Sequence, residues 1–213
     1  MSKTTEDLIA ELAAAAAPVK RLAPPMLRAL AWLLVVALIA GAAILKLSNL
    51  HAFAARASDP RLAVELFATL ATGLAGVIAA FHLSVPGRAQ AWALLPAPFA
   101  ALWVGLSGLG CWKYWAEQTT NGWRLGESAH CFVFLLGVGI PLAGLLLFSL
   151  RKAHPLQPRL VASVGAVGVA ALAAFILQFF HPFDVTLMDF GAHLAALAIV
   201  IAAASVSGRP ALA

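Results

Sequence analysis

Six long apolar runs constrain the fold of this chain more than any other feature of its sequence. The hydrocarbon core of a bilayer is about 30 Å thick, and a helix needs ~20 residues to cross it. The runs cover residues 28–47, 62–83, 90–109, 130–150, 160–180 and 188–206. Only 11% of the 213 residues are charged, less than half the share in an average soluble domain. We therefore expect an all-α fold, an integral membrane bundle of six transmembrane helices, with no separate soluble catalytic domain.

Prolines and small residues within these runs predict how the helices bend and pack. Pro96 and Pro98 in the third run, and Pro141 in the fourth, are expected to kink their helices. Small residues recur at helix-packing spacing in the second and fifth runs, at Ala68, Thr72, Gly76, Ala80, Gly165 and Gly168. Because small side chains let backbones approach closely in lipid, these two runs are expected to contact other helices tightly.

The first 27 residues are predicted to form a short amphipathic helix followed by a basic tether. The run Thr5-Glu6-Asp7-Leu8 is typical of a helix start, with acidic residues in the first turn. Pro18 should end the helix. The apolar face of the helix consists of Leu8, Ile9 and Leu12, and the basic segment after it contains Lys20 and Arg21. Two interpretations remain open, a helix that lies on the membrane surface and a docking helix for a soluble partner.

Lysine and arginine are distributed unequally between the two sides of the predicted bundle. The side with both termini carries nine of them, and the other side carries five, namely Lys46, Arg56, Arg61, Lys113 and Arg124. The positive-inside rule therefore places both termini in the cytoplasm. The net charge of +5 reflects the same bias, so direct binding to nucleic acid is not expected. We expect a cytoplasmic segment at 1–27, a transmembrane domain at 28–208 and a cytoplasmic tail at 209–213.

Cys111 and Cys131 are the two cysteines of the chain, and they lie at the two ends of a polar loop between the third and fourth runs. The predicted orientation puts this loop outside the cytoplasm, where a disulfide can persist. The pair is compatible with two unrelated apolar side chains, a fixed bridge, a reversible dithiol, or capture of a soft metal ion or an oxidant. His130 could lower a thiol pKa or act as a ligand. The spacing matches no compact metal motif, so no metal site is assigned.

Asp189 and His193 lie one helical turn apart inside the sixth run. Ionisable side chains within a transmembrane helix usually face the bundle interior. The pair could form a polar clasp between helices, or it could bind a proton or a metal ion. Glu65 and Asp184 fall near the same outer face and could join a polar cluster around the cysteines.

Sequence signatures of enzymes are missing from this chain. It has no nucleophile elbow, phosphate-binding loop, His-Glu-x-x-His or Cys-x-x-Cys motif. We therefore expect a protein that is not an enzyme and needs no cofactor. Two alternatives remain, a small transporter for a metal or solute and a membrane thiol oxidoreductase.

Short motifs at the ends of the runs resemble those of the NrsF-type family of membrane proteins. They are Leu8-Ile9-x-x-Leu12-Ala13 with Pro18-Val19-Lys20-Arg21, Leu83-Ser84-Val85-Pro86-Gly87, Gly108-Leu109-Gly110-Cys111, Cys131-Phe132, Pro155-Leu156-x-Pro158 and Phe180-His181-Pro182. The resemblance implies a six-span anti-sigma factor that holds an ECF-type sigma factor and releases it on heavy-metal or oxidative stress. It also implies that Cys111 and Cys131 sense the stress and that the N-terminal segment docks the sigma factor.

This resemblance leads to a hypothesis for signalling through the bundle. Metal capture or oxidation at Cys111 and Cys131 would change how the third and fourth runs pack at their outer ends. The proline-kinked third run would pass the change to the connection 84–90, and the docking surface would loosen.

Overall fold

The computed structural model describes residues 4–16, 21–56, 58–117, 125–180 and 187–212, and it gives only the backbone for 110–117, 125–128 and 187–189. These ranges contain helices and no strand. The elements, in chain order, are α1 (Thr5–Ala15), α2 (Pro25–Leu47), α3 (Leu50–Arg56), α4 (Pro60–Leu83), η1 (Gln90–Leu94), α5 (Ala97–Glu117), α6 (Leu125–Leu150), η2 (Arg151–Ala153), α7 (Pro158–Leu177) and α8 (Leu187–Leu212).

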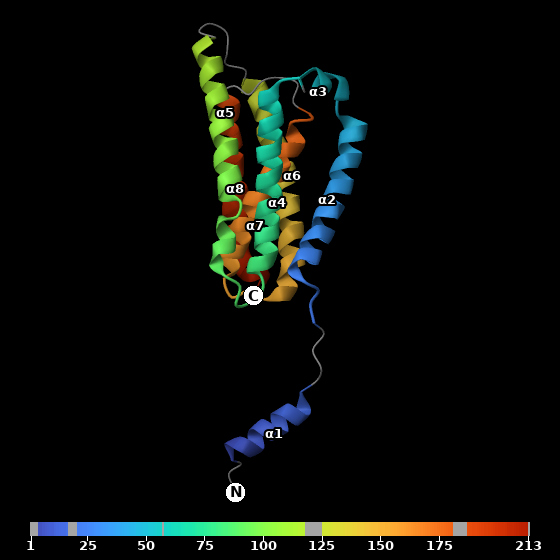
Figure 1. Cartoon of the computed structure of the whole chain (residues 1–213), viewed down its shortest axis with the longest axis vertical. Helices are drawn as coiled ribbons and strands as arrows, with labels where there is room; N and C mark the ends of the chain where they lie inside the picture. Colours follow the sequence, from blue (N-terminus) through green and yellow to red (C-terminus); the bar gives the residue numbers. More distant parts are fainter. Residues whose placement is uncertain (1–3, 17–20, 57, 118–124, 181–186, 213) are drawn as a thin grey trace.

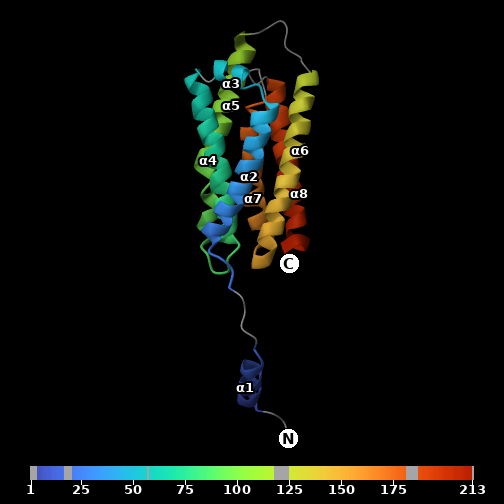
Figure 2. The same cartoon turned by 90° about the vertical axis from the view of Figure 1, so that its right-hand side faces the viewer.

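The prediction of six membrane-spanning helices is confirmed by length and composition. Six helical segments are long and apolar enough to cross a bilayer: Pro25–Leu47, Pro60–Leu83, Gln90–Leu109, Ala129–Ala153, Pro158–Leu177 and Phe190–Leu212. The protein is therefore a multi-pass membrane protein. We call the end of the bundle where α2 begins and α8 ends the terminal face, and the end that carries α3 the opposite face (Figure 1). The helix α1 lies apart from the bundle, beyond the terminal face (Figures 1 and 2).

The helix α7 is the centre of the bundle, and its tightest contact is with α4. The predicted close approach of small residues is confirmed here. A Cβ atom built on Gly76 would lie 2.6 Å from the Cα atom of Gly168, and one built on Gly168 would lie 2.7 Å from the backbone nitrogen of Val77. The two backbones touch, so only glycine fits at these positions. Van der Waals contact between backbones replaces the hydrophobic drive that lipid does not provide.

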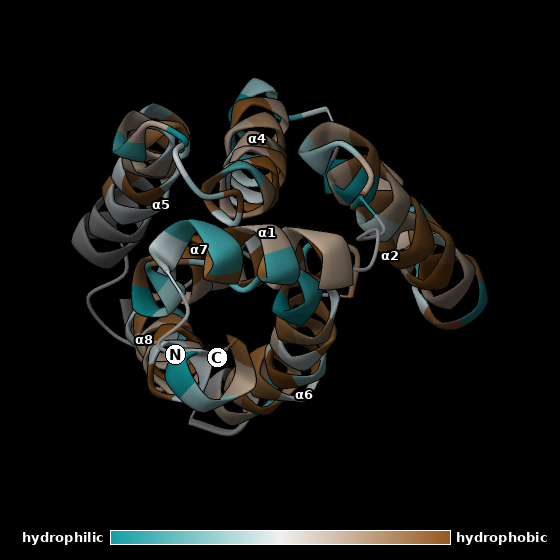
Figure 3. Ribbon diagram, turned by 90° about the horizontal axis from the view of Figure 1, so that it is seen from below, coloured by the Kyte–Doolittle hydropathy of each residue, from teal (hydrophilic) through white to brown (hydrophobic). Residues whose placement is uncertain are grey.

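The helix α2 lies at the edge of the bundle and packs mainly against α4 (Figure 3). Its apolar side chains, such as Leu34 and Leu38, are more than half exposed and would face lipid in a membrane. One polar anchor fixes its first turns. The Arg28 guanidinium stacks 5.2 Å from the centre of the Phe81 ring and donates to the Ser149 carbonyl at 3.1 Å. The start of α2 is thereby held to the ends of α4 and α6.

The third span differs from the single kinked helix that the sequence predicts. Its first turns form the 3₁₀ helix η1, the chain turns at Leu95 and Pro96, and α5 begins only at Ala97. Because proline has no amide hydrogen to donate, the two prolines separate two helices instead of bending one. Pro141, in contrast, lies inside α6, which continues through it.

Candidate functional site

Both cysteines lie inside helices, which corrects the expectation that they stand at the two ends of a polar loop. Cys111 precedes the end of α5 at Glu117 by six residues, and Cys131 follows the start of α6 at Leu125 by six residues. At a rise of ~1.5 Å per residue, each position is about 9 Å along its helix from the connection. The helices therefore extend beyond the apolar runs, into the polar residues up to Glu117 and from Leu125 onward.

Cys131 is buried, with 3% of its surface exposed, so it does not lie at an open mouth. It belongs to an apolar cluster with Leu135 of α6, Leu177 of α7 and Ala196 of α8. His130, its neighbour in the chain, is exposed. The side chain of Cys111 lies outside the described residues, so the distance between the two sulfur atoms stays untested.

The third and fourth spans have other helices as their main neighbours over the described residues, and whether they meet at the cysteines stays a prediction. Over the described residues α5 packs on α4 and α8, whereas α6 packs on α7 and α8. The end-on view shows α7 and α8 between α5 and α6 (Figure 3). Any change at Cys131 therefore acts on α7 and α8, and on Trp103 of α5, which packs against the same cluster.

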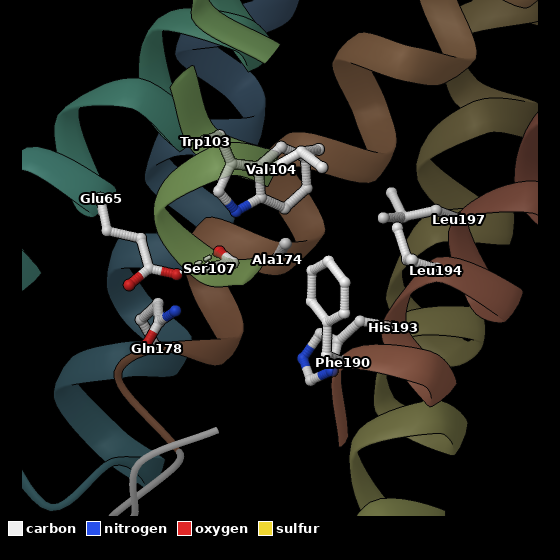
Figure 4. A pocket seen from close by; sticks show the side chains of 10 residues that line it. All are labelled: Glu65, Trp103, Val104, Ser107, Ala174, Gln178, Phe190, His193, Leu194 and Leu197. Atoms are coloured by element: carbon white, nitrogen blue, oxygen red, sulfur yellow. Dashed lines mark hydrogen bonds between the residues drawn. The ribbon is translucent and has the colours of Figure 1, made fainter. Parts of the chain in front are cut away.

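A small cavity with a mostly apolar lining and a few polar side chains opens beside the Cys131 cluster, between α4, α5, α7 and α8 (Figure 4). Glu65 of α4 is 9% exposed, and its Oε1 atom accepts a hydrogen bond of 2.5 Å from the Ser107 hydroxyl of α5. Gln178 and His193 also line the cavity. Its free volume of about 30 Å³ is enough for water and too small for an organic solute. Trp103 and Ala174 line both the cavity and the cysteine cluster, so the two are contiguous.

The cavity tests the sequence predictions in part. Glu65 and His193 line this one cavity, at the opposite end of the bundle from the termini, whereas the sequence grouped Glu65 with Asp184 and His193 with Asp189. The side chain of Asp189 and all of Asp184 lie outside the described residues, so the Asp189–His193 pair stays a prediction. Sequence reasoning missed Ser107. Ser107 could have been noticed as a polar side chain within an apolar run, one helical turn before Cys111.

We expect Ser107→Ala to destabilise the bundle. The substitution removes the hydrogen-bond partner of a buried carboxyl group, which costs about 1–3 kcal/mol. The melting temperature of the purified protein in one fixed detergent measures the loss. Ser149→Ala is the matched control, because that exposed hydroxyl donates only to Leu145 of its own helix. Equal shifts for the two variants would contradict a special role for the link between α4 and α5.

A second hollow lies at the terminal face, and we call it the terminal cleft. It has about 80 Å³ of free space. Its walls come from the connection after α4 and from the segment that leads into α7. The lining residues are Leu83, Val85, Pro86, Gly87, Arg88, Gln90, Leu156, Gln157, Leu160 and Val161.

The first wall of the terminal cleft is held rigidly in place. His82 is buried, and its ring stacks on Trp92 of η1 with 4.0 Å between centroids. The buried Ser84 hydroxyl donates to the Phe81 carbonyl at 2.7 Å. Gly87 has a φ of 81°, which a residue with a side chain rarely adopts, and it turns the chain toward α5. The cleft is thus formed before any ligand arrives.

The predicted N-terminal helix is present as α1, and each of its residues is exposed. A capping box starts it: the Asp7 amide donates to the Thr4 hydroxyl, and the Asp7 carboxylate accepts from the Thr4 amide and hydroxyl. Ile9 and Leu12 are 61% and 63% exposed. Leu8 is also exposed, so the apolar face stands open to water. Of the predicted tether, Arg21 is exposed, while Pro18 and Lys20 lie outside the described residues.

The capping box makes α1 sensitive to acid. Hydrogen bonds from the Thr4 hydroxyl and amide lower the pKa of Asp7 below its usual range. A depressed pKa contributes stability that is present in full above the ordinary Asp pKa of about 3.9 and is lost as the pH falls through the lowered value. Protection of α1 amides in hydrogen exchange, corrected for intrinsic rates, should fall in that window. Asp7→Ala should show the low protection already at neutral pH; a pH profile like that of the unchanged chain would contradict this.

Comparison with known proteins identifies the family. A family model described as "NrsF: Negative regulator of sigma F" matches residues 12–213. The chain belongs to the NrsF family. The resemblance seen in the sequence motifs is thereby confirmed. No curated protein and no solved structure matches the chain.

The NrsF match indicates what kind of partner the exposed parts of the protein would bind. The family is described as a negative regulator of a sigma factor, so a sigma factor is the implied partner. The match covers all six spans and the last turn of α1, from Leu12 onward, whereas Leu8 and Ile9 precede it. Most of the NrsF match is membrane bundle. The parts that can meet a soluble protein are α1 and the faces at the two ends of the spans.

Proposed function

We propose that this protein is an anti-sigma factor of the inner membrane that binds an ECF-type sigma factor through α1 and releases it on heavy-metal or oxidative stress. The observation that carries the proposal is the exposed apolar face of α1 in a family of negative regulators. A helix with open Leu8, Ile9 and Leu12 matches the spacing of helices that bind in a groove of a partner. The acidic residues of α1 disfavour the alternative that it rests on anionic lipid.

The charge bias supports a cytoplasmic position for α1. Nine of the 14 lysine and arginine residues belong to the side with both termini, and α1 lies beyond that face of the bundle (Figure 2). The positive-inside rule thus supports a position of α1 in the cytoplasm, the compartment that contains sigma factors.

The burial of Cys131 suggests how stress would act. A metal ion or an oxygen atom added to a sulfur packed against α7 and α8 overfills the cluster, which costs about 1–3 kcal/mol. The helix α7 runs from this cluster to Leu160 and Val161 in the terminal cleft. A shift of α7 would therefore reach the terminal face without any contact between α5 and α6.

The energy needed for release exceeds this steric contribution. A change from 99% bound to 1% bound takes about 5.5 kcal/mol of differential binding. A metal–thiolate bond can add several kcal/mol. So can a disulfide, formed as two thiols pass two electrons and two protons to an oxidant. The proposal therefore includes Cys111 with Cys131, with His130 as a nearby exposed imidazole.

Retention of the sigma factor tests the docking part of the proposal. The chain in detergent should co-purify with an ECF sigma factor of the same cell, and a chain that lacks residues 1–24 should not. The shortened chain must elute as the same single species, because the bundle is unchanged. Equal retention by both chains would remove α1 from the docking site. Transport of a metal by the protein in liposomes, without retention of any sigma factor, would favour the transporter alternative.

A double Cys111→Ser, Cys131→Ser variant tests the sensing part. We expect target genes to stay repressed under cadmium or chromate, while sigma retention without stress is unchanged. Normal induction in this variant would rule out the cysteines as sensors.

A further inference from the structure

Acidic residues are absent from the sequence that forms the terminal face of the bundle. No Asp or Glu occurs in residues 21–58, 66–116 or 128–183, or after residue 189. The same face exposes several cations, namely Arg88, Arg151, Lys152, Arg159 and Arg209. The acids on this side of the chain are the three of α1: Glu6, Asp7 and Glu11. The helix and the face are therefore opposite in charge.

The two surfaces also both combine aliphatic side chains with charged ones. At about 100° per residue, Glu6 and Glu11 flank the apolar stripe of Leu8, Ile9 and Leu12 on its two sides. Aliphatic side chains such as Leu83 and Leu160 line the terminal cleft together with polar groups that include Arg88, and Arg159 directly precedes the lining residue Leu160 in the chain. Leu156 on its rim is 78% exposed and lies between two spans, outside the segments that face lipid.

The connection between the two surfaces is long enough for them to meet. Residues 16–24 join α1 to α2, and nine residues extend to about 30 Å. Arg28 near the start of α2 stacks on Phe81, which is two residues before Leu83 in the cleft wall. The tether therefore begins next to the cleft, and such a short link gives an effective concentration of roughly millimolar.

We propose that the terminal cleft is a docking site for α1 of the same chain. One aliphatic side chain of the stripe of Leu8, Ile9 and Leu12 enters the cleft and the others lie over the exposed Leu156 at its rim, while Glu6 and Glu11 pair with the basic residues Arg88 and Arg159. This inference rests on the proposed function in one respect: the docked α1 is the helix that would otherwise hold the sigma factor. The bundle and the sigma factor then compete for one helix, and a shift of α7 that reshapes the cleft changes the outcome.

A photo-crosslink within the full chain tests the docking. Ala13, at the edge of the apolar stripe, is replaced by p-benzoylphenylalanine, and the protein is placed in nanodiscs with one chain per disc and no sigma factor. Mass spectrometry should find an intrachain product that joins residue 13 to residues 83–90 or 156–161. Raising NaCl from about 0.1 M to 1 M shortens the Debye length from ~10 Å to ~3 Å and should lower the yield severalfold.

Charge exchange makes the test specific. Glu6→Lys with Glu11→Lys should lower the yield severalfold, and these changes leave every bundle residue intact, so a misfolded bundle cannot explain the loss. Arg88→Glu with Arg159→Glu should do the same, and the four changes together should restore the product. Lys46→Glu on the opposite face is the control and should have no effect. The proposal would be overturned if residue 13 gave no crosslink, or if it crosslinked only to lipid or to a second chain. It would also be overturned if the four changes together did not restore the intrachain crosslink.

The competition between the bundle and the sigma factor for α1 is measured separately from the docking of α1 in the cleft. Added sigma factor should reduce the crosslink in proportion to its retention. A crosslink with no retained sigma factor would refute the proposed function and leave the docking intact. Retained sigma factor with no crosslink would refute the docking and leave the proposed function intact, and an unchanged crosslink at full retention would refute the competition.

Discussion

Gly168→Leu will separate α4 from α7 and prevent the protein from being recovered as a folded bundle. A Cβ atom at this position lies 2.7 Å from the backbone nitrogen of Val77 and 2.9 Å from the carbonyl oxygen of Gly73. Overpacking a core that can adjust costs about 1–3 kcal/mol. Here the obstructing atoms are backbone, so the helices themselves must part, and we expect a larger loss.

Size-exclusion chromatography after detergent extraction measures this effect as the share of protein in the monodisperse peak. Gly144→Leu is the matched control, since a Cβ atom there meets nothing within 4 Å and the position is exposed on α6. The control should behave as the unchanged chain does. A Gly168→Leu peak as large as that of the control would show that the glycine contact is dispensable.

Ile9→Gln with Leu12→Gln will weaken sigma-factor binding by about 100-fold or more, if α1 is the docking helix. Burial of each aliphatic side chain contributes about 1.5–3 kcal/mol, and every 1.4 kcal/mol is a factor of ten in Kd. Glutamine favours helix nearly as well as leucine, so α1 should remain helical. Biolayer interferometry with the purified chain in nanodiscs gives the Kd.

Ala10→Gln with Ala14→Gln supplies the control for that measurement. Both positions are exposed on the face of α1 opposite the apolar stripe, and the same side chain is introduced. Its Kd should match that of the unchanged chain. If both double variants bind equally well, the apolar stripe is not the contact surface.

The sequence predicts the spans and the positions of close helix contact, because both follow from local chemistry. Runs of apolar residues as long as a bilayer is thick leave little alternative to helices, and small residues such as Gly76 and Gly168 mark where a backbone can approach, although not which helix it meets. The order of helices around the bundle is different. Lipid-facing and partner-facing surfaces are equally apolar in this chain, so nothing in the runs shows that α7 and α8 lie between α5 and α6.

The candidate sites were predictable to different degrees for the same reason. The helix α1 is exposed, so its capping residues and its apolar stripe contrast with polar neighbours and can be recognised in the sequence. Cys111 looked like a loop residue because polar residues follow it, yet α5 continues to Glu117, and α6 begins at Leu125, before the predicted start of the fourth run at residue 130. The Glu65–Ser107 hydrogen bond joins two spans through residues 42 positions apart, and no local pattern relates such partners.

The central position of α7 has a consequence for how the protein is made. The chain is synthesised from its N-terminus, so the glycine face of α4 enters the membrane before α7 exists. The 75 residues from Leu83 to Pro158 take roughly 4–15 s to translate at ~5–20 residues per second. During that interval lipid must occupy the place that α7 later takes. Biogenesis of this protein therefore ends with the displacement of lipid by its fifth span, and a ribosome that stalls before Pro158 leaves a membrane intermediate with its tightest interface unfilled.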